Sequence, residues 1–346
     1  MDMEELLKEL SDLRGISGFE YRIADEIEKR FRMYTDDVHR DALGSVIACK
    51  KSSDPHALKL MIEAHMDEIG LMVKDIDENG FITFVNIGGV DPRILPAAEV
   101  IIHGTRDIPG IIGAKPPHLQ GAEESKKSVK INDMAIDTGY SRDAIADIVS
   151  IGDSITLAQS AGVLANRRFS GKTLDDRAGI AVLLEVLRNI DFDPALELYF
   201  VAAVQEEVGL RGAKTAAYSI APDAAIAIDV CHGVTPDNAE NAFEIGSGTV
   251  ISIGPNITPA FQKQLVDTAQ RHNIRYALDV DGGDTGTDAW AIQVAREGVP
   301  TTLLSIPLKY MHTSVETIDI ADAEATAALI LEFIKDFGRE EEGFCC

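Results

Sequence analysis

The sequence ALELYFVAAVQEE occupies residues 195–207, and its apolar run ends in two adjacent carboxylates, Glu206 and Glu207. The apolar residues predict a buried strand, and the glycines at positions 209 and 212 predict a loop directly after it. Two carboxylates this close resist ionising together unless a cation or a proton lies between them. Open α/β sheets also bind their ligands at the carboxyl edge of the strands. The pair therefore indicates a ligand-binding strand end, with a solvated strand end as the alternative.

Helices and strands alternate on both sides of this stretch. The spacing of apolar residues predicts helices over 4–13, 20–33, 176–190, 259–272, 288–296 and 320–337. Strands are predicted over 36–49 with a turn at 42–44, over 58–70 where the strand runs into a loop, and over 195–204, 224–229, 274–280 and 300–306. Residues 70–164 differ, because they offer short strand-like runs between turns, frequent prolines and little helical periodicity. This order predicts an α/β domain that is interrupted by a small β-rich domain.

Composition and charge exclude several classes of protein. The chain has 346 residues, enough for two domains, and a formal net charge of −25. Such a charge does not attract nucleic acid or anionic membranes, so we expect neither as a partner. The acidic start lacks the basic region of a secretory signal, and no apolar run approaches the roughly 18 residues of a spanning helix. The four cysteines, Cys49, Cys231, Cys345 and Cys346, lack disulfide-framework or zinc-finger spacing. We therefore expect a cytoplasmic protein.

Side chains that can bind metal ions stand at the ends of several predicted elements. They are His65 with Asp67, the pair Asp175-Asp176, the pair Glu206-Glu207, Asp229, and His312. Each place has a plain structural alternative: a core histidine, a helix N-cap or a solvated strand end. The alternatives weaken when taken together, because five accidents would have to fall on one edge of one sheet. Two histidines with several carboxylates suit a borderline cation such as zinc or cobalt, and there are enough carboxylates for two ions with one shared bridge.

Five motifs containing these residues occur along the chain. They read AHMDEIG at 64–70, LDDRAG at 174–179, QEEVGLRGA at 205–213, IDV at 228–230 and YMHTSVE at 310–316. Together they resemble the tetrahedral, glutamyl-type metallo-aminopeptidases, a family often labelled "endoglucanase M", and the resemblance covers nearly the whole chain. It implies a zinc-peptidase-like catalytic domain, with a mixed sheet flanked by helices, formed by residues 1–69 and 165–346. It also implies a β-barrel-like insertion at 70–164 that serves dimerisation and assembly.

The resemblance implies a role for each residue of the set. The metal ligands would be His65, Asp175, Glu207, Asp229 and His312, with Asp175 bridging two divalent ions. Glu206 would be the general base, Asp67 would orient His65, and a cis peptide would join Asp175 to Asp176. Because neighbouring strand residues point opposite ways, Glu206 and Glu207 would divide their tasks.

A water molecule held between two dications loses a proton near neutral pH, and a carboxylate outside the ligand set passes that proton to the leaving amine. The expected activity is therefore removal of N-terminal residues from short peptides through a metal-bridging hydroxide. The resembled family assembles as a dodecamer, and we expect dimers as the building block. The strand edges of the β-rich insertion would need a partner or cover, which makes that insertion the expected contact.

Three alternatives stay open at this point: an amidohydrolase or deacylase of small N-acyl substrates, an endoglucanase, and a non-catalytic metal-binding scaffold. Aromatic residues make up only 6% of the chain, with Trp290 the single tryptophan, which leaves little surface for stacking sugars. Gly171-Lys172-Thr173 resembles the end of a P-loop, but its first glycine is missing, since residue 166 is asparagine. His118 is expected to be a loop residue, with contact with the active site as the alternative. The stretch 282–288 and the pair Thr313-Ser314 differ from many relatives, so the preferred N-terminal residue is not predicted.

Overall fold

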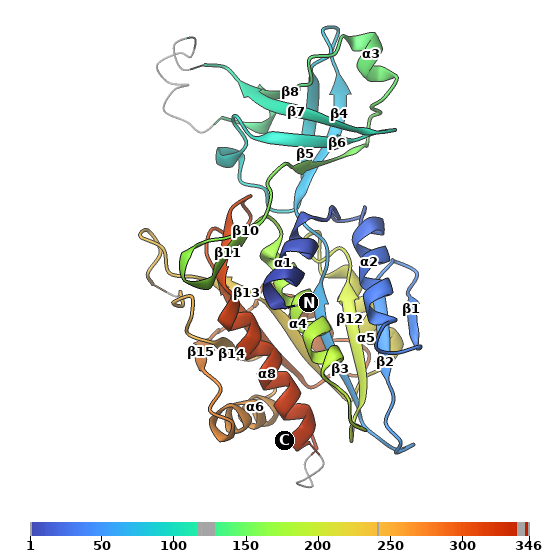
Figure 1. Cartoon of the computed structure of the whole chain (residues 1–346), viewed down its shortest axis with the longest axis vertical. Helices are drawn as coiled ribbons and strands as arrows, with labels where there is room; N and C mark the ends of the chain where they lie inside the picture. Colours follow the sequence, from blue (N-terminus) through green and yellow to red (C-terminus); the bar gives the residue numbers. More distant parts are fainter. Residues whose placement is uncertain (1, 117–118, 120–128, 241, 338–342, 345–346) are drawn as a thin grey trace.

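The computed structural model describes residues 2–116, 119, 129–240, 242–337 and 343–344. Its two parts are a large sheet covered by helices and a β-barrel that stands at one end of it (Figure 1). This arrangement confirms the predicted fold class, a mixed α/β sheet with an inserted barrel. His118 and the Cys345-Cys346 pair lie outside the described residues.

The large sheet is mixed. Its eight strands have the order β1 (Val38–Arg40), β2 (Val46–Lys50), β12 (Glu197–Ala203), β3 (Lys59–His65), β13 (Ala224–His232), β16 (Thr301–Leu308), β14 (Thr249–Ile253) and β15 (Tyr276–Val280). The neighbours β12, β3, β13 and β16 are parallel, whereas β2 and β14 run antiparallel to them. The carboxyl ends of four parallel strands therefore meet at one edge of the sheet.

Helices cover both faces of this sheet, because its buried strands are apolar on both sides. One face packs against α1 (Met3–Asp12), α2 (Tyr21–Phe31), α4 (Leu174–Arg188), α6 (Pro259–Arg271) and α8 (Ile320–Asp336). The other face packs against α5 (Arg211–Ile220) and α7 (Asp288–Gln293). Strand β3 shows the alternation: Leu60 and Ile62 face the five-helix side, and Met61 faces α5 and α7. Helix α4 is buried almost throughout, as its nearly continuous apolar sequence requires.

The barrel is closed. Its strands follow the order β4 (Gly70–Ile76), β5 (Ile82–Ile87), β8 (Met134–Asp137), β7 (Asp107–Ala114), β6 (Glu99–His103) and β9 (Ser154–Leu157). Pairing of β9 with β4 completes the ring around an apolar core of its own, and the short helix α3 (Arg142–Ala146) packs beside it. Closure confirms the β-barrel-like insertion and pairs each strand with two neighbours, so the strand edges are covered within the barrel and not by a second copy. The chain returns to the sheet through a small sheet of β10 (Gly162–Val163), β11 (Arg168–Gly171) and β17 (Glu316–Asp319).

Two predicted elements end earlier than the sequence suggested. Helix α7 stops at Gln293 rather than at residue 296, where Arg296 adopts a left-handed φ of 53°. Strand β12 stops at Ala203, and Gln205 turns the chain with a φ of 58°. Glu206 and Glu207 therefore lie in a turn, so strand alternation is not what separates their side chains.

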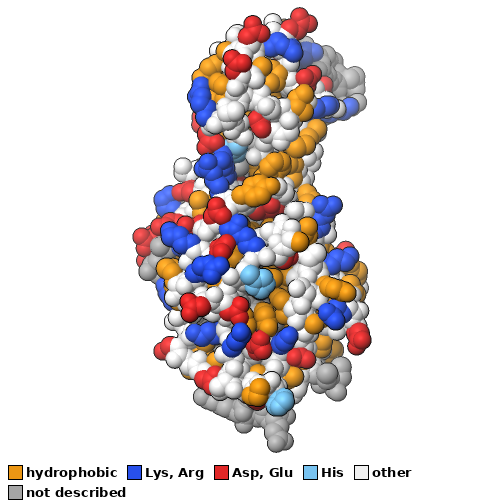
Figure 2. Space-filling view, turned by 90° about the vertical axis from the view of Figure 1, so that its right-hand side faces the viewer, with side chains coloured by type: hydrophobic (Ala, Val, Ile, Leu, Met, Phe, Trp, Pro, Cys, Tyr) orange, Lys and Arg blue, Asp and Glu red, His pale blue; other side chains and the backbone are white. Residues whose placement is uncertain are grey.

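The surface carries both signs of charge, as one face of the molecule shows (Figure 2). On that face, hydrophobic side chains gather where the barrel joins the larger part of the molecule. Within the described residues, no helix has the length and hydrophobicity needed to cross a membrane.

A buried group of charges ties the end of β3 to the start of α4. Glu68 is buried and pairs with the Lys172 ammonium at 2.6 Å and with the Arg177 guanidinium at 3.3 Å. Arg177 also donates to the carbonyl oxygens of Met66 at 3.2 Å and Leu10 at 2.8 Å. The lysine of the P-loop-like Gly171-Lys172-Thr173 therefore has a structural partner inside the protein. These contacts fix two chain segments that each lead into the candidate site described below.

We predict that Glu68→Gln lowers the free energy of unfolding by ~3–5 kcal/mol, because it leaves two cations buried without their carboxylate. Urea denaturation followed by circular dichroism measures this. The matched control is Glu324→Gln, which breaks the exposed pair between Glu324 and Arg167 and should cost no more than ~1 kcal/mol. Equal effects of the two variants would contradict the role assigned to the buried group.

Candidate active site

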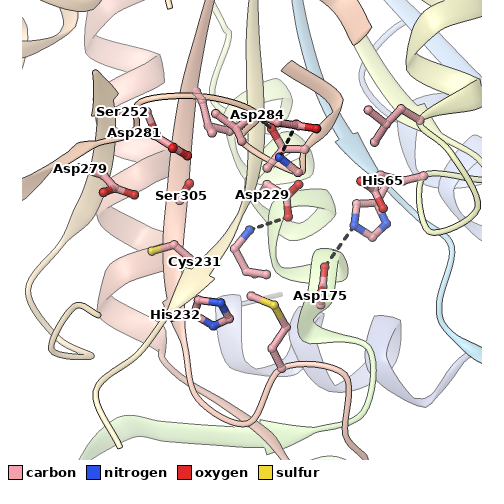
Figure 3. A pocket seen from close by; sticks show the side chains of 18 of the residues that line it. His65, Asp175, Asp229, Cys231, His232, Ser252, Asp279, Asp281, Asp284 and Ser305 are labelled. Atoms are coloured by element: carbon pink, nitrogen blue, oxygen red, sulfur yellow. Dashed lines mark hydrogen bonds and ion pairs between the residues drawn. The ribbon is translucent and has the colours of Figure 1, made fainter. Parts of the chain in front are cut away.

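A cavity of about 690 Å³ opens at the carboxyl edge of the parallel strands. Six residues singled out from the sequence line it together: His65, Asp175, Glu206, Glu207, Asp229 and His312. Figure 3 shows His65, Asp175 and Asp229 among them. Asp67 lies behind them and is fully buried. The fold therefore brings together residues that are separated by up to 247 positions in the chain.

Each residue reaches the cavity from the end of a regular element. His65 is the last residue of β3, and Asp229 lies near the end of β13. Asp175 lies in the first turn of α4, with non-helical backbone angles. Glu206 and Glu207 occupy the turn after β12, and His312 follows β16 with a left-handed φ of 60°. Rigid elements thus hold the set, and turns aim the two glutamates and His312.

Asp175 stands at the centre of the set. Its Oδ1 lies 3.1 Å from His65 Nε2, and its Oδ2 lies 3.3 Å from His312 Nε2. His312 Nε2 also lies 3.5 Å from Glu207 Oε1. One carboxylate therefore faces two imidazoles from opposite parts of the chain, the geometry of a bridging ligand.

The donors form three overlapping triplets. Within each triplet, the three ligand atoms lie within 4.8 Å of one another. They are His65 with Asp175 and Asp229, Asp175 with Glu207 and His312, and His65 with Glu206 and Glu207. Imidazole nitrogen with carboxylate oxygen is a donor set that suits zinc and similar divalent cations. The first two triplets share Asp175, so the residues fit two adjacent cations.

Crowding of carboxylates shifts their protonation. Burial raises the pKa of Glu206 to about 10, of Glu207 to about 8 and of Asp229 to about 7, and neighbouring carboxylates add to each shift. Asp175 is different: although its burial favours the neutral acid, the His312 and His65 imidazoles hold its pKa well below the usual range. The hydrogen bond to Asp175 raises the pKa of His312 to about 9. Without a cation, the carboxyl groups of this site cannot all be ionised at once. Binding of cations would allow them to ionise together, so the arrangement favours cation binding.

Asp67 organises the turn that carries the glutamates. Its two oxygens accept the backbone N–H of Glu206 at 3.0 Å and of Glu207 at 3.2 Å, and Ser17 Oγ donates to it at 2.5 Å. Its Oδ1 also lies 3.6 Å from His65 Nδ1, the ring nitrogen that faces away from Asp175. Asp67 therefore stands where it can orient His65, and the structure adds a second task that the sequence did not suggest.

The adjacent aspartates have separate tasks. Asp175 lines the cavity, whereas Asp176 Oδ1 accepts the backbone N–H of Gly179 at 3.0 Å inside the first turn of α4. The helix-capping alternative thus applies to Asp176 alone. The peptide bond between the two residues is cis, which confirms that prediction.

Sequence reasoning missed Glu316, which was quoted in a motif but given no role. Glu316 is buried at the start of β17, and its oxygens accept the backbone N–H of Asp175 at 3.1 Å and of His312 at 2.9 Å. It therefore holds two candidate ligands at once. Its position four residues after His312 was a signal, but the contact with Asp175 spans 141 residues and needs the fold.

Comparisons with known proteins agree with this geometry. A family model described as M42 glutamyl aminopeptidase matches residues 44–329. The chain is 36% identical over 338 residues to a lysyl aminopeptidase of Pyrococcus furiosus, covering 96% of both chains. An aminopeptidase from the archaeon Desulfurococcus kamchatkensis superposes with a TM-score of 0.90 at 35% identity, covering 96% of this chain and 94% of that one. Pyrococcus horikoshii TET1 peptidase, which can assemble into a tetrahedron or a large octahedral shell, gives 0.85 at 32% identity, covering 96% and 99%.

We predict that Glu316→Gln lowers the affinity for Zn²⁺ by roughly 10–100-fold, the usual effect of removing a group that orients metal ligands. A glutamine keeps one acceptor oxygen, so one of the two backbone contacts is lost. Competition with a chromophoric chelator measures the affinity. Glu297→Gln, at an exposed position away from the cavity lining, is the matched control. An unchanged affinity in Glu316→Gln would remove this residue from the site.

Proposed function

This chain belongs to the M42 glutamyl aminopeptidase family, and we propose that it is a dinuclear metal-dependent aminopeptidase that removes N-terminal residues from short peptides. Membership makes the chain a peptide hydrolase, and peptidases of this family are metallopeptidases. The observation that supports two ions is the pair of donor triplets that share Asp175. Family names do not select the substrate's first residue, since the family is named for glutamyl and one relative for lysyl substrates.

The proposal assigns the candidate ligands to two positions. His65, Asp175 and Asp229 would hold one cation, and Asp175, Glu207 and His312 would hold the other. Two divalent cations, zinc or cobalt by their donor preference, supply a Lewis acid for the scissile carbonyl and lower the pKa of water. Asp67 orients the His65 ring through Nδ1 and keeps Nε2 directed at the site.

Glu206 is the proposed general base. It lines the cavity next to His65 and Glu207, and its backbone is fixed by Asp67. Burial raises its pKa to about 10, and positive charge brought next to it lowers that pKa, so the carboxylate becomes available with the ions in place. In this role Glu206 accepts a proton from water and delivers it to the leaving amine.

The charge of the cavity favours an aminopeptidase over a hydrolase of N-acyl amino acids. Among the described residues, the lining includes three carboxylates besides the candidate metal ligands and Glu206, namely Asp279, Asp281 and Asp284, but neither lysine nor arginine. A free substrate N-terminus carries a positive charge that this lining attracts. An N-acyl amino acid lacks that charge and brings a carboxylate, which the same lining repels. Cleavage of unblocked but not of acetylated peptides is therefore the outcome that the proposal requires.

We predict that Glu206→Gln keeps two metal ions per chain and lowers kcat by roughly 10²–10⁴, the usual contribution of a general base. Metal analysis and peptide hydrolysis are measured on the same preparation. The contrasting variant is Asp175→Asn, which replaces the shared carboxylate with an amide and should lose metal and activity together. A Glu206→Gln protein with full occupancy and near wild-type turnover would exclude Glu206 from the reaction.

We also propose that the two domains have different functions and that the chain forms a closed homo-oligomer. Residues 1–69 and 165–346 would form the catalytic domain, and residues 70–164 would form an assembly domain.

Because the barrel is closed, the contact between copies would be made by side chains and not by strand edges. The barrel exposes Ile111 on β7 and Ile151 before β9, at 56% and 70% of their surface. Exposed apolar side chains of this size are suited to packing against a second copy.

We predict that the metal-loaded protein forms a particle of about 450 kDa, twelve times the 37.4 kDa chain, built from dimers. Light scattering coupled to gel filtration measures the mass. Ile111→Asp should shift it towards smaller species, because a charge is then buried at the contact. Met33→Asp, the same kind of change at an exposed apolar residue of the other domain, is the control. A fully active particle of one chain's mass would contradict the assembly and leave the chemistry untouched.

A further inference from the structure

A row of polar side chains crosses the cavity floor away from the candidate metal ligands. Asp229 on β13 stands opposite Ser305 on β16, and Ser305 stands opposite Val250 on β14. Ser252 follows Val250 by two residues, so it lies on the same face, and it stands opposite Asp279 on β15. Figure 3 shows Ser305 between Asp229 and two further carboxylates, Asp279 and Asp281. The row therefore leads from the reaction site to an acidic end at the edge of the sheet.

The hydroxyl groups in the middle of the row belong to Ser305 and Ser252, and neither hydroxyl has a hydrogen-bond partner among the described residues. Ser305 and Ser252 line the cavity, yet their side chains are only 3% and 2% exposed. Both residues line the cavity, so each hydroxyl can donate a hydrogen bond to, or accept one from, a molecule that occupies it. Because both serines lie in the row, the cavity floor offers hydroxyl groups to a bound substrate.

The acidic end is not neutralised within the described part of the chain. Asp279 and Asp281 form no ion pair there, although both are half-buried in the cavity wall. Burial raises the pKa of Asp279, and the nearby Asp281 raises it further. A third carboxylate, Asp284, shapes the loop above them by accepting the backbone N–H of Gly286 at 2.8 Å. A cation placed between these groups would remove their mutual repulsion.

Resting on the proposed function, we propose that this row is the subsite for the side chain of the substrate's N-terminal residue and that it selects lysine and arginine. Asp279 and Asp281 would bind the terminal positive charge, and Ser305 and Ser252 would face the stem. An acidic substrate side chain is repelled there, because the described lining offers it no lysine or arginine. A subsite for a substrate leucine would be lined by apolar side chains. The serines at positions 305 and 252 of the sheet fit a polar substrate side chain instead.

The dimensions of the row agree with a long side chain. From β13 to β15 are three strand spacings, which amount to about 14 Å. A lysine side chain places its ammonium on a four-carbon stem of about 6 Å. The remaining distance holds the scissile carbonyl at one end and one hydrogen bond of about 2.9 Å to a carboxylate at the other. A short substrate side chain leaves the acidic end unreached, so the row distinguishes length as well as charge.

The test uses two matched substrates, the p-nitroanilides of L-lysine and L-norleucine, with the metal-loaded full chain. Norleucine keeps the four-carbon stem and lacks the ammonium, so the ratio of the two kcat/KM values isolates the charge. We expect a ratio of at least about ten in favour of lysine. Asp279→Asn and Asp281→Asn should each lower the ratio by about tenfold, mainly through the KM for lysine, since a charged hydrogen bond is lost.

The control is Asp267→Asn, which removes the same charge from the exposed face of α6, where Asp267 pairs with Lys263. It should leave the ratio of the two kcat/KM values unchanged, because it changes the charge of the protein only at a site away from the cavity. A ratio near one, or a ratio insensitive to both cavity variants, overturns the inference while hydrolysis of the anilides supports the proposed function.

A binding measurement keeps the two proposals separate if turnover is absent. Calorimetry compares L-lysinamide with L-norleucinamide on metal-loaded Glu206→Gln protein, which needs no catalysis. Tighter binding of lysinamide that is lost in the Asp281→Asn background supports the subsite even if no anilide is cleaved, a result that would overturn the proposed function alone. Equal binding of the two amides overturns the subsite.

Discussion

Burial of several carboxylates within contact distance of one another is the constraint on which the site depends. Asp175, Glu206, Glu207 and Asp229 share one cavity, and burial disfavours the charged form of each. His65 and His312 balance part of this charge by facing Asp175 from two sides. The remaining imbalance is the physical basis for inferring divalent cations. Because burial raises the pKa of Glu206 until cations are close to it, the availability of this base is tied to the loaded state.

Such a site must be held against its own repulsion, and the fold does so from behind the cavity. Asp67 binds the backbone of the glutamate turn, and Glu316 binds the backbones of Asp175 and His312. Glu68, Lys172 and Arg177 fix the chain at the end of β3 and the start of α4. These contacts act on backbone groups and ion pairs away from the reacting atoms, so the candidate ligands remain free to bind metal.

One face of the sheet joins the proposed chemistry to the proposed selectivity. His65, Asp229 and Ser305 lie on the face that α5 and α7 cover farther along the strands. The described cavity lining includes no residue of either helix, and this part of the face forms the cavity floor. The same sheet carries both the reaction site and the acidic end of the row. The distance between them is therefore set by the spacing of the strands. Asp279 belongs to a paired strand, so the sheet fixes its place relative to the reaction site.

Local patterns were enough to predict the alternation of helices and strands, the β-rich insertion and the ligand-type residues. Strand ends marked His65, Glu206, Glu207 and Asp229, because apolar runs stop there at side chains that strands do not bury without reason. The resemblance carried by the five motifs supplied the cis peptide and the family. Only the tertiary structure placed Asp175 between two imidazoles, moved the glutamates into a turn and gave Glu316 its task. These features depend on contacts between distant segments, such as residues 175 and 316, and local sequence spacing carries no information about which segments meet.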